Sequence, residues 1–434
     1  MVMLLRALAQ RSARAVATNA QAQKKAIDLK ALCSAWQRAA AFSTQSSVYT
    51  WGTGTQGQLG HGPVVKSGIR NAYEQLTPKL VEAFEGMEIV KLEFGATHSA
   101  ALDSQGRLYT WGSNEYNKLG LGPGTSDAEP LPRLVEAFEG ITIVDISCGD
   151  YTTAAVDSEG KMYSWGWGGS TMKGAGGLGH AGGQDEPTPR LLQTLVDQGV
   201  PIANVECGEF HTIALSKDGE VWAWGNGEYG RLGNGEALTC EVPEPIEFFA
   251  KENIKSITAG RDFTFVITED GDVYTWGVNS HNQLGIGGGL AMDFYNMEAI
   301  PTPVEFFRGR NVVQIAAGYD HTAAVTDDGT LFMWGSKLWL EPHEMTILKG
   351  EKIVQVACGR EYTVALSDEG KVFTFGKGSS NALGHGDRKN QLQPLQVAAL
   401  SGVNVTSVSA GDYHMGVISH PHATAMDKDF SLRE

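Results

Sequence analysis

Short runs of alternating apolar and polar residues recur along most of the chain. One unit reads IVDISCG, TTAAVDS and KMYSWG over residues 143–149, 152–158 and 161–166. Such brief runs, rich in β-branched and aromatic residues, are typical of β-strands. An acidic residue followed by Gly separates the second run from the third in most units and favours a tight hairpin, because glycine tolerates positive φ. A fourth run follows the glycine-rich loop, as in residues 132–138, so the pattern predicts four antiparallel strands per unit.

Two signatures mark these units, and each occurs seven times. An aromatic–Gly pair ends the third run, and its aromatic residues are Trp51, Trp111, Trp165, Trp224, Trp276, Trp334 and Phe375. A turn of the form Gly-x-x-His, with variants, joins the first run to the second and starts at Gly95, Gly149, Gly208, Gly260, Gly318, Gly359 and Gly411. Four short strands in each repeat of about fifty residues are typical of a propeller blade. We therefore predict an all-β fold, a seven-bladed β-propeller, with the six tryptophans as structural residues of the repeat.

The two ends of the repeat region complement each other. The repeats begin with a third-strand segment at residues 46–52 and end with first- and second-strand segments at residues 404–419. Together these segments make one complete blade, which would leave no long unpaired sheet edge. We predict that N- and C-terminal strands close the ring in one blade. The propeller would span residues 46–419, with a leader at 1–45 and a short polar tail at 420–434.

Composition narrows the function. The formal net charge of -16 disfavours binding to a phosphate backbone, so no direct DNA contact is expected. No run of eighteen apolar residues exists, and no membrane insertion is expected. The five cysteines form no CxxC pair, which argues against a zinc site or a disulfide framework. With no P-loop and no Gly-x-Ser-x-Gly motif, we predict no catalytic residues, no cofactor and no enzyme activity.

The leader has a different composition from the rest of the chain. Residues 1–45 hold seven basic residues against one acid, Asp28. On a helical wheel its early leucines fall on one side, away from the early arginines. An Arg-rich, acid-poor amphipathic start is typical of a mitochondrial transit peptide, here with cleavage expected near residues 39–46. We predict a mitochondrial, matrix location; a disordered basic arm on a cytoplasmic protein is the alternative.

The paired signatures WGxxxxxQLGxG and Gly-x-x-His-Thr resemble those of the regulator of chromosome condensation family. The resemblance covers residues 47–419 and, with the leader, is that of a mitochondrial-type member. It implies the propeller fold. Proteins of this kind serve nucleotide exchange on the small GTPase Ran, ubiquitin-ligase scaffolding, light sensing and organelle ribosome assembly, so the fold alone does not imply one function. The light-sensing members have Trp in their turns, and none of the seven turns here does.

The resemblance carries over only some residues of the Ran exchange factor. Its GTPase-facing groups lie in the glycine loops and turns of one face. Asp150 and His321 match such groups, an acid is present but shifted at Glu209, and Thr55 stands where the family has an acid. The family's wedge insertion corresponds to residues 167–177, whose sequence does not match.

Four histidines recur at one repeat position: His98, His211, His321 and His414. Metal ligands on separate blades would have to converge on the axis, which tetrahedral coordination makes geometrically demanding. We interpret His98, His211 and His414 as structural residues that hydrogen-bond neighbouring blades, and we predict no metal site.

The two variable positions of the turns carry mostly acids: Asp150, Glu209, Asp262, Asp320, Glu361 and Asp412, with Arg261 and Arg360 among them. If the turns share one face, they form a mostly acidic ring around the axis. Asp150, Glu209, Asp320 and His321 are therefore candidate partner-binding residues. The alternative is that short polar side chains cap the turns.

Two loops depart from the repeat. In the sixth repeat the Leu-Gly-x-Gly loop is missing, and Trp339 and Leu340 replace polar residues. In the fifth, an extended loop at residues 285–301 carries Phe294 and Tyr295. Long loops in compact folds are often functional, and buried aromatic residues dominate interface energetics. Trp339, Phe294 and Tyr295 are candidate docking residues; packing into their own blades is the alternative.

Three functions remain open. The first is a non-catalytic, protein-binding propeller, a mitochondrial scaffold or assembly factor with a protein or ribonucleoprotein partner. The second is a guanine-nucleotide exchange factor or other regulator of a small GTPase. The third is a constitutive structural subunit of a larger mitochondrial complex.

Overall fold

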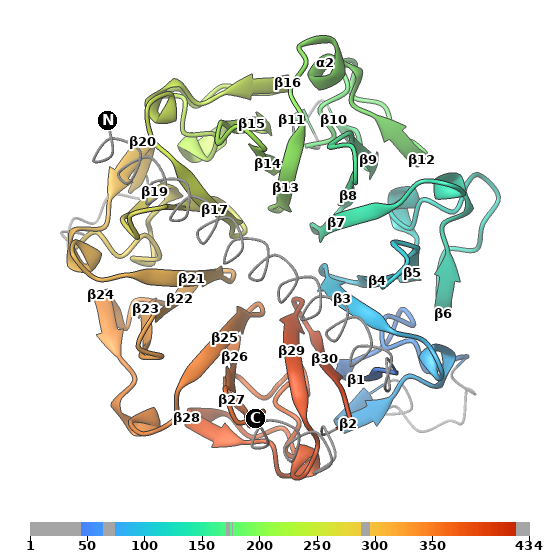
Figure 1. Ribbon diagram of the computed structural model, residues 1–434, viewed down its shortest axis with the longest axis vertical. Helices are drawn as coiled ribbons and strands as arrows, with labels where there is room; N and C mark the ends of the chain where they lie inside the picture. Colours follow the sequence, from blue (N-terminus) through green and yellow to red (C-terminus); the bar gives the residue numbers. More distant parts are fainter. Residues whose placement is uncertain (1–44, 64–73, 171–173, 176, 288–295, 422–434) are drawn as a thin grey trace, which may run out of the picture. The chain divides into compact units, whose positions relative to one another are not determined.

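The computed structural model describes residues 45–63, 74–170, 174–175, 177–287 and 296–421. The predicted transit peptide and residues 422–434 of the predicted tail lie outside this part. Within it, seven four-stranded antiparallel sheets follow one another around a central axis (Figure 1). The predicted all-β, seven-bladed propeller is confirmed. We number the blades by their aromatic–Gly pairs, so that Trp51 belongs to blade one and Phe375 to blade seven. None of the helices in the described ranges is long and apolar enough to cross a membrane.

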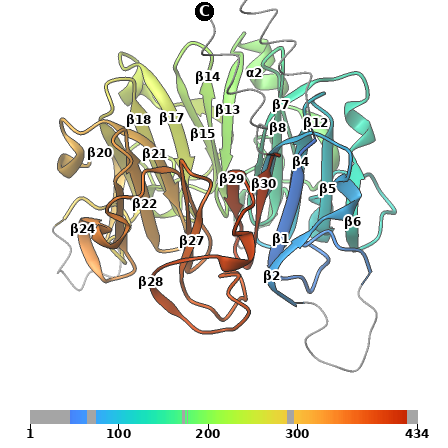
Figure 2. The ribbon, with the colours of Figure 1, turned by 60° about the horizontal axis from the view of Figure 1, so that its bottom comes forward.

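The strands run from the axis outward in each blade. Blade two contains β3 (Ile89–Phe94), β4 (His98–Asp103), β5 (Leu108–Ser113) and β6 (Ala128–Leu134). Blade three contains β7 (Ile143–Cys148), β8 (Thr152–Asp157), β9 (Met162–Gly166) and β12 (Glu186–Leu191). Blade four contains β13 (Ile202–Cys207), β14 (His211–Ser216), β15 (Val221–Gly225) and β16 (Cys240–Pro245). Blade five contains β17 (Ile254–Ala259), β18 (Phe263–Thr268), β19 (Val273–Val278) and β20 (Met297–Pro303). Blade six contains β21 (Val312–Ala317), β22 (His321–Thr326), β23 (Leu331–Gly335) and β24 (Trp339–Glu344). Blade seven contains β25 (Ile353–Cys358), β26 (Tyr362–Ser367), β27 (Val372–Gly376) and β28 (Gln391–Gln396). The innermost strands surround the axis, and Figure 2 shows the sheets standing side by side around it.

Short helical segments follow the outer strands or lie in the loops. The former are η1 (Glu82–Phe84), η3 (Glu136–Phe138), α2 (Gln193–Asp197), η5 (Glu247–Phe249), η6 (Glu305–Phe307), η7 (Thr346–Leu348) and η8 (Ala398–Leu400). The latter are η2 (Glu115–Asn117) and η4 (Glu228–Gly230). A two-stranded hairpin, β10 (Gly169–Ser170) and β11 (Gly174–Ala175), extends from blade three.

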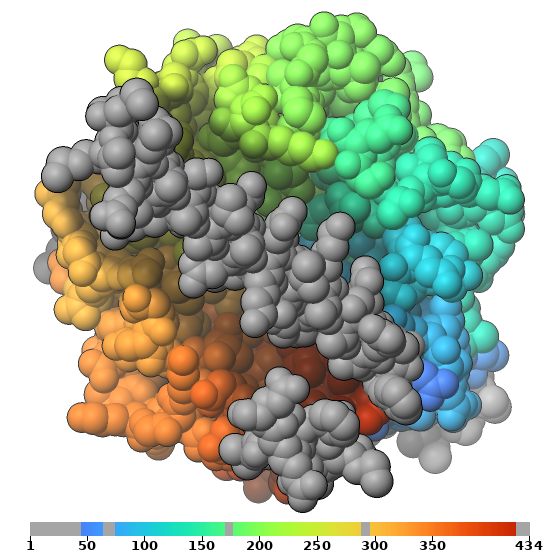
Figure 3. All heavy atoms as spheres, viewed as in Figure 1, coloured from blue at the N-terminus to red at the C-terminus, as the bar shows by residue number. Residues whose placement is uncertain are grey.

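Blade one is assembled from both ends of the described chain. Its strand order is β2 (Glu74–Leu80), β1 (Ser47–Thr53), β30 (His414–Ser419) and β29 (Val405–Ala410). Strand β1 pairs with β30 from Ser47↔Ser419 to Gly52↔His414. The predicted closure in one blade is therefore confirmed, and β1 and β30 lie side by side in Figure 1. Figure 3 shows the same order of colours around the space-filling ring.

The turns and the glycine loops lie on one face of the ring. In blade two the second strand begins at His98, which pairs with Gly112 at the end of the third strand. The turn before the second strand and the loop after the third strand therefore emerge together. We call this side the loop face.

The repeat tryptophans fasten each blade to the one before it. All six are fully buried. Each indole Nε1 donates a hydrogen bond of 2.8–3.0 Å to a backbone carbonyl in the glycine loop of the preceding blade; the pairs are Trp51–Ala382, Trp111–Gln58, Trp165–Lys118, Trp224–Gly177, Trp276–Arg231 and Trp334–Gln283. A buried indole N–H needs such an acceptor. The repeat residues thus join blades as well as fill them.

The Leu-Gly step of each glycine loop fits against the next tryptophan. Between blades five and six, Leu284 is fully buried in one apolar cluster with Trp334. Gly285 has φ of 70°, and a Cβ there would lie 2.6 Å from the Trp334 indole nitrogen. Only glycine satisfies both conditions. Burial of such a leucine contributes roughly 1.5–3 kcal/mol before other effects.

Candidate functional site

The turn histidines lie inside the blade junctions. Each Nε2 is hydrogen-bonded to a hydroxyl of the following blade; the pairs are His98–Thr153, His211–Thr264, His321–Thr363 and His414–Ser99, at 2.8–3.0 Å. This geometry agrees with the structural interpretation of these residues. Because a buried imidazole is favoured in its neutral form, burial lowers the pKa of His211 and of His414 to about 3 and that of His98 well below its usual value.

His321 differs from the other three. Its side chain is buried, and burial by itself lowers its pKa. The neighbouring Cys358 and Asp320 outweigh that effect and raise the pKa to about 10. The Asp320 carboxylate lies 3.8 Å from His321 Nδ1 and accepts a 2.9 Å hydrogen bond from the Ser336 hydroxyl. His321 and Asp320 thus lie together at the edge of blade six, where the carboxylate favours the protonated form of the imidazole.

The acidic turn residues are paired more fully than their sequence indicates. The ion pairs are Glu209–Arg261, Asp262–Arg231, Asp412–Arg360 and Glu361–Lys377. Two of these cations, Arg231 and Lys377, come from the glycine loops and were not part of the predicted ring. Tyr319 lies between Arg261 and Arg360, whose guanidinium carbons are 4.0 and 4.3 Å from its ring centroid. The loop face therefore carries a mixed ionic network at the axis.

The pKa of the Asp150 carboxyl is raised within this network. Burial, together with the negative charges of Asp412 and Glu209, raises its pKa to about 8. Its backbone carbonyl accepts a 3.1 Å hydrogen bond from Lys118 Nζ. Asp150 is thus placed on the loop face, where burial and the neighbouring carboxylates favour its neutral form.

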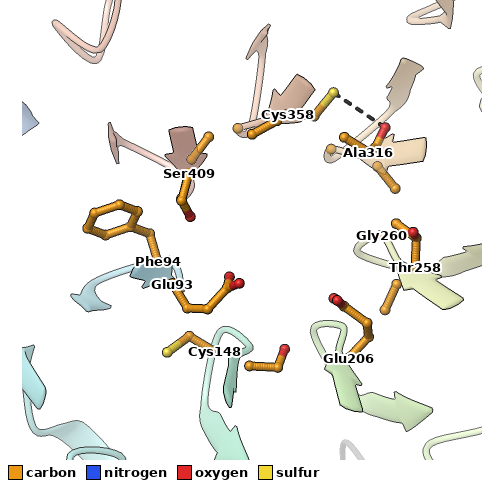
Figure 4. Close-up of a pocket in the computed structure, with 18 of the residues that line it drawn as sticks. Glu93, Phe94, Cys148, Glu206, Thr258, Gly260, Ala316, Cys358 and Ser409 are labelled. Atoms are coloured by element: carbon orange, nitrogen blue, oxygen red, sulfur yellow. Dashed lines mark hydrogen bonds between the residues drawn. The ribbon is translucent and has the colours of Figure 1, made fainter. Parts of the chain in front are cut away.

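The axis itself contains a cavity of about 290 Å³ between the innermost strands. Glu93 and Glu206 point into it (Figure 4), and burial raises the pKa of both carboxyls. Beside them, Lys91 donates a 2.5 Å hydrogen bond to Asp145, whose other oxygen accepts from the Val205 backbone N–H. This chain of contacts links blades two, three and four. Among the described residues, no group of His, Cys, Asp and Glu has the geometry to hold a metal ion.

Blade six lacks the loop that the other blades place over their neighbours. Strands β23 and β24 are joined by residues 336–338 alone, in a tight turn with φ of 50° at Ser336 and 61° at Lys337. Trp339 and Leu340 belong to strand β24, so the predicted apolar loop is instead a hairpin turn followed by a strand. The reason is local: Gly335 pairs directly with Trp339, which leaves no room for a longer loop.

The missing loop leaves an apolar cleft of about 360 Å³ between blades six and seven. Phe375 and Trp339 line its wall, and the side chains of Leu338 and Leu392 are 72% and 90% exposed at its rim. Trp339 is half-buried and stacks on His343 with ring centroids 5.1 Å apart. Phe375 stands where the other blades have Trp. The substitution is consistent with the missing loop, because an indole N–H here would find no loop carbonyl to bond.

Sequence reasoning missed an aromatic cluster on the opposite part of the loop face. Tyr116, Tyr151, Trp167 and Phe210 lie in mutual contact across blades two to four, with ring centroids 5.6–6.0 Å apart. Tyr116 has positive φ, as does Tyr229 at the same position in the loop of blade four, so this backbone conformation belongs to the repeated turn. An available signal was the Glu-Tyr pair in the loops of blades two and four, where blade one has Thr-Gln.

The remaining candidates are easily placed. Asp320, His321 and Trp339 lie together at the cleft, whereas Asp150 and Glu209 lie in the turns of blades three and four. Phe294 and Tyr295 lie outside the described residues. Of the three candidate docking residues in the two irregular loops, only Trp339 is therefore described.

A closed ring of seven blades, with a Trp-to-loop hydrogen bond at six of the seven junctions, defines a β-propeller of tandem aromatic–Gly repeats. Residues 47–417 match the family model described as the RCC1-like domain, and the chain belongs to this family.

Several curated relatives share the repeat region. The ultraviolet-B receptor UVR8 of Arabidopsis thaliana is 34% identical over 305 residues, which are 70% of this chain and 64% of the receptor. The E3 ubiquitin-protein ligase HERC2 of Homo sapiens is 34% identical over 68% of this chain and 6% of the ligase. The mitochondrial RCC1 domain-containing protein RUG3 of Arabidopsis thaliana is 33% identical over 67% of this chain and 61% of that protein. The matched region is therefore less than two thirds of each of these relatives.

Two solved structures share the fold. Prp20p of Saccharomyces cerevisiae, described with its binding to Gsp1p and histones, superposes with a TM-score of 0.77 at 22% identity and covers 89% of this chain and 94% of its own. Human WBSCR16 superposes with a TM-score of 0.73 at 20% identity and covers 87% of this chain and 99% of its own. At these identities the likeness concerns the fold alone.

Proposed function

We propose that the protein is a non-catalytic, protein-binding propeller that serves as a mitochondrial scaffold or assembly factor, and that it docks its partner at the cleft between blades six and seven. The cleft is the observation that carries this proposal. At this cleft blade six departs from the repeat and leaves apolar side chains exposed, and contiguous exposed apolar surface marks interaction sites. Trp339 supplies an aromatic side chain of the kind that dominates interface energetics.

The mitochondrial part of the proposal rests on the leader. Its basic, acid-poor composition is that of a transit peptide, and RUG3, a relative, is described as mitochondrial. N-terminal sequencing of the protein isolated from mitochondria should find the chain starting near residue 46. An intact Met1 in a cytosolic pool would contradict import.

The docking proposal is tested by proximity labelling in intact cells with a Leu392→Asp variant. A charge at this exposed position should remove specific labelled partners and leave the melting temperature unchanged. Leu238→Asp is the matched control, because Leu238 is a 65% exposed leucine in the loop of blade four, away from the cleft. Partners that persist with Leu392→Asp and not with Leu238→Asp would place docking elsewhere.

A second candidate function, regulation of a small GTPase, is favoured by hairpin β10–β11. The hairpin follows Trp167, at the place where the resemblance to the Ran exchange factor implies a wedge, and the aromatic cluster adjoins it. Release of a fluorescent guanine nucleotide from candidate GTPases tests this function. Acceleration by the protein, lost on Tyr116→Ala, would support it. No acceleration of any candidate would leave the scaffold proposal in place.

The third possibility, a constitutive subunit, differs from the first in permanence. Co-purification at fixed stoichiometry through high-salt washing would favour a subunit over an assembly factor that binds its client transiently.

A further inference from the structure

We infer that the cleft between blades six and seven receives a short loop of a partner protein that carries the step Leu-Gly. The inference rests on the proposed function, because it names the segment that would occupy that docking surface. The protein itself identifies this occupant. In the described structure, blades one to five and blade seven each dock such a loop on the next blade.

The side-chain pocket is suited to leucine. The loop leucines of those blades are all buried, and they are Leu59, Leu119, Leu178, Leu232, Leu284 and Leu383. Leu232, Leu284 and Leu383 each share an apolar cluster with the repeat tryptophan of the following blade. In blade seven, Phe375 presents an apolar ring at the tryptophan position, and the cleft of about 360 Å³ lies against it. A leucine side chain there would be removed from water against an apolar wall.

A hydroxyl donor is in place beside this pocket. In blade six, Thr322 Oγ1 donates a 2.8 Å hydrogen bond to the carbonyl of Gln283, the residue before the loop leucine. Thr363 holds the same position in blade seven and lines the cleft, where its hydroxyl is bonded to His321 Nε2. In blade three, Thr153 has the same contact with His98 and donates a 2.7 Å hydrogen bond to the carbonyl of Lys118, which precedes Leu119. Thr363 is placed to act in the same way toward the carbonyl that precedes a docked leucine.

A backbone acceptor completes the pattern. In four of the six loops, the third residue after the loop leucine donates its N–H to the outer strand of the next blade at 2.9–3.1 Å; the pairs are Gly62–Pro130, Gly122–Pro187, Gly235–Ala299 and Gly386–Leu76. Each acceptor follows the residue that pairs with the glycine of the aromatic–Gly pair. In blade seven Gly376 pairs with Gln391, so this acceptor is Leu392. Its 90% exposed side chain lies at the rim, where a docked loop would cover it.

The charges at the cleft indicate an uncharged occupant. Glu361 forms an ion pair with Lys377, and Asp320 accepts a hydrogen bond from Ser336 and lies 3.8 Å from His321 Nδ1. A partner side chain with a charge would find its opposite already engaged. A Leu-Gly step carries no side-chain charge, which suits a cleft whose charged groups are already paired with one another.

The probe is a fluorescently labelled peptide HNQLGIG, copied from residues 281–287 of blade five, and it is titrated against the full chain. We expect saturable binding with a dissociation constant on the order of 0.1–1 mM. The peptide HNQDGIG, in which Asp replaces leucine, should bind on the order of tenfold more weakly or worse, because the leucine burial is lost. Equal binding of the two peptides would overturn the inference.

Variants of the protein separate docking from folding. Phe375→Trp restores an indole N–H for the loop carbonyl, and we expect HNQLGIG to bind a few-fold to about tenfold more tightly. Thr363→Val should weaken binding by a similar factor. Thr322→Val is the control, since it removes the same donor from a junction that the chain already fills, and it should lower the melting temperature without changing peptide affinity. Unchanged affinity in both cleft variants would overturn the inference.

The outcomes also distinguish the inference from the proposed function. If HNQLGIG does not bind but Leu392→Asp removes partners in cells, the cleft docks something other than a Leu-Gly loop. If HNQLGIG binds as expected but Leu392→Asp keeps its partners, the cleft is not the docking surface. A concentration-dependent dimer in light scattering that Leu392→Asp abolishes would make a second copy the occupant and overturn the inference.

Discussion

Blade five covers blade six with a loop that buries Leu284, whereas blade six covers blade seven with only the turn at residues 336–338. Both junctions use the same strand pairing. The second strand of blade five begins at Phe263 and that of blade six at His321, which are equivalent positions. The two junctions differ in whether a loop carbonyl meets an indole: Trp334 bonds Gln283, and Phe375 has a cleft beside it. The comparison shows that the glycine loop of one blade and the tryptophan of the next depend on each other. At the junction between blades six and seven, both are absent.

The largest difference between the two junctions should appear when a leucine is removed from each. Leu284→Ala takes a fully buried side chain from a packed junction and should lower the free energy of unfolding by about 2–5 kcal/mol. Leu338→Ala at the open junction removes a 72% exposed side chain and should change it by less than about 0.5 kcal/mol. Denaturant titration measures both. Similar losses would mean that the cleft is packed in solution.

Exchanging the aromatic residues should have the next largest effect. Trp334→Phe removes the indole donor to Gln283 and leaves space in a buried cluster, so we expect a loss of roughly 2–3 kcal/mol. Phe375→Trp places an indole in a junction with room for it and should shift stability by less than about 1 kcal/mol. Thermal melting of the pair gives the comparison. A severe loss from Phe375→Trp would contradict the assigned cleft.

Two junction histidines should respond oppositely to acid: His211, between blades four and five, and His321, between blades six and seven. Burial lowers the folded-state pKa of His211 to about 3, below the unfolded value near 6.5, so stability falls as pH falls below about 6.5. At pH 5 this amounts to about 2 kcal/mol, which His211→Asn should abolish. The folded-state pKa of His321 is raised to about 10, so its stabilisation is complete below pH 6.5 and is lost as pH rises toward 10.

His321→Asn should therefore remove none of the acid sensitivity between pH 7.5 and pH 5. Unfolding titrations of both variants at the two pH values check the sign. If His321→Asn relieves acid destabilisation as His211→Asn does, the two junctions have the same electrostatics.

The smallest effect is expected at the far side of blade seven. The Tyr362 hydroxyl lies 2.8 Å from the backbone carbonyls of both Gly411 and His414 in blade one, in place of the usual histidine contact. Tyr362→Phe removes one donor and should cost about 0.5–1.5 kcal/mol. Because Tyr362 also lines the cleft, a change in HNQLGIG affinity beyond about twofold would show that the two sides of blade seven are coupled.

Much of the fold was predictable because each repeat carries the same pattern of strand-forming runs, turns and glycines. Seven aromatic–Gly pairs and seven turns indicated the blade number, and the half-units at either end indicated closure. The histidine pairs were anticipated as contacts between blades. The missing loop of blade six was visible in the sequence as well, although Trp339 was assigned to a loop and lies in strand β24.

The candidate site was less predictable. The turn ring looked mostly acidic because Arg231 and Lys377 lie in other segments and join it only through the fold. The Glu-Tyr pair marked the blade-two loop in the sequence, but the contact of Tyr116 with Trp167 joins loops of two blades and forms only through the fold.

By itself, the sequence determined the blade count, the closure and the positions of the buried tryptophans, since these depend on local strand pattern and on repetition. It also marked blade six as irregular. Only the tertiary structure showed that the absence of this loop from blade six affects the junction with blade seven. Thr363, Phe375 and Leu392 line the cleft that it leaves there. The physical reason is that a loop packs on the next blade, so its absence opens a surface about forty residues further along the chain, which no local pattern records.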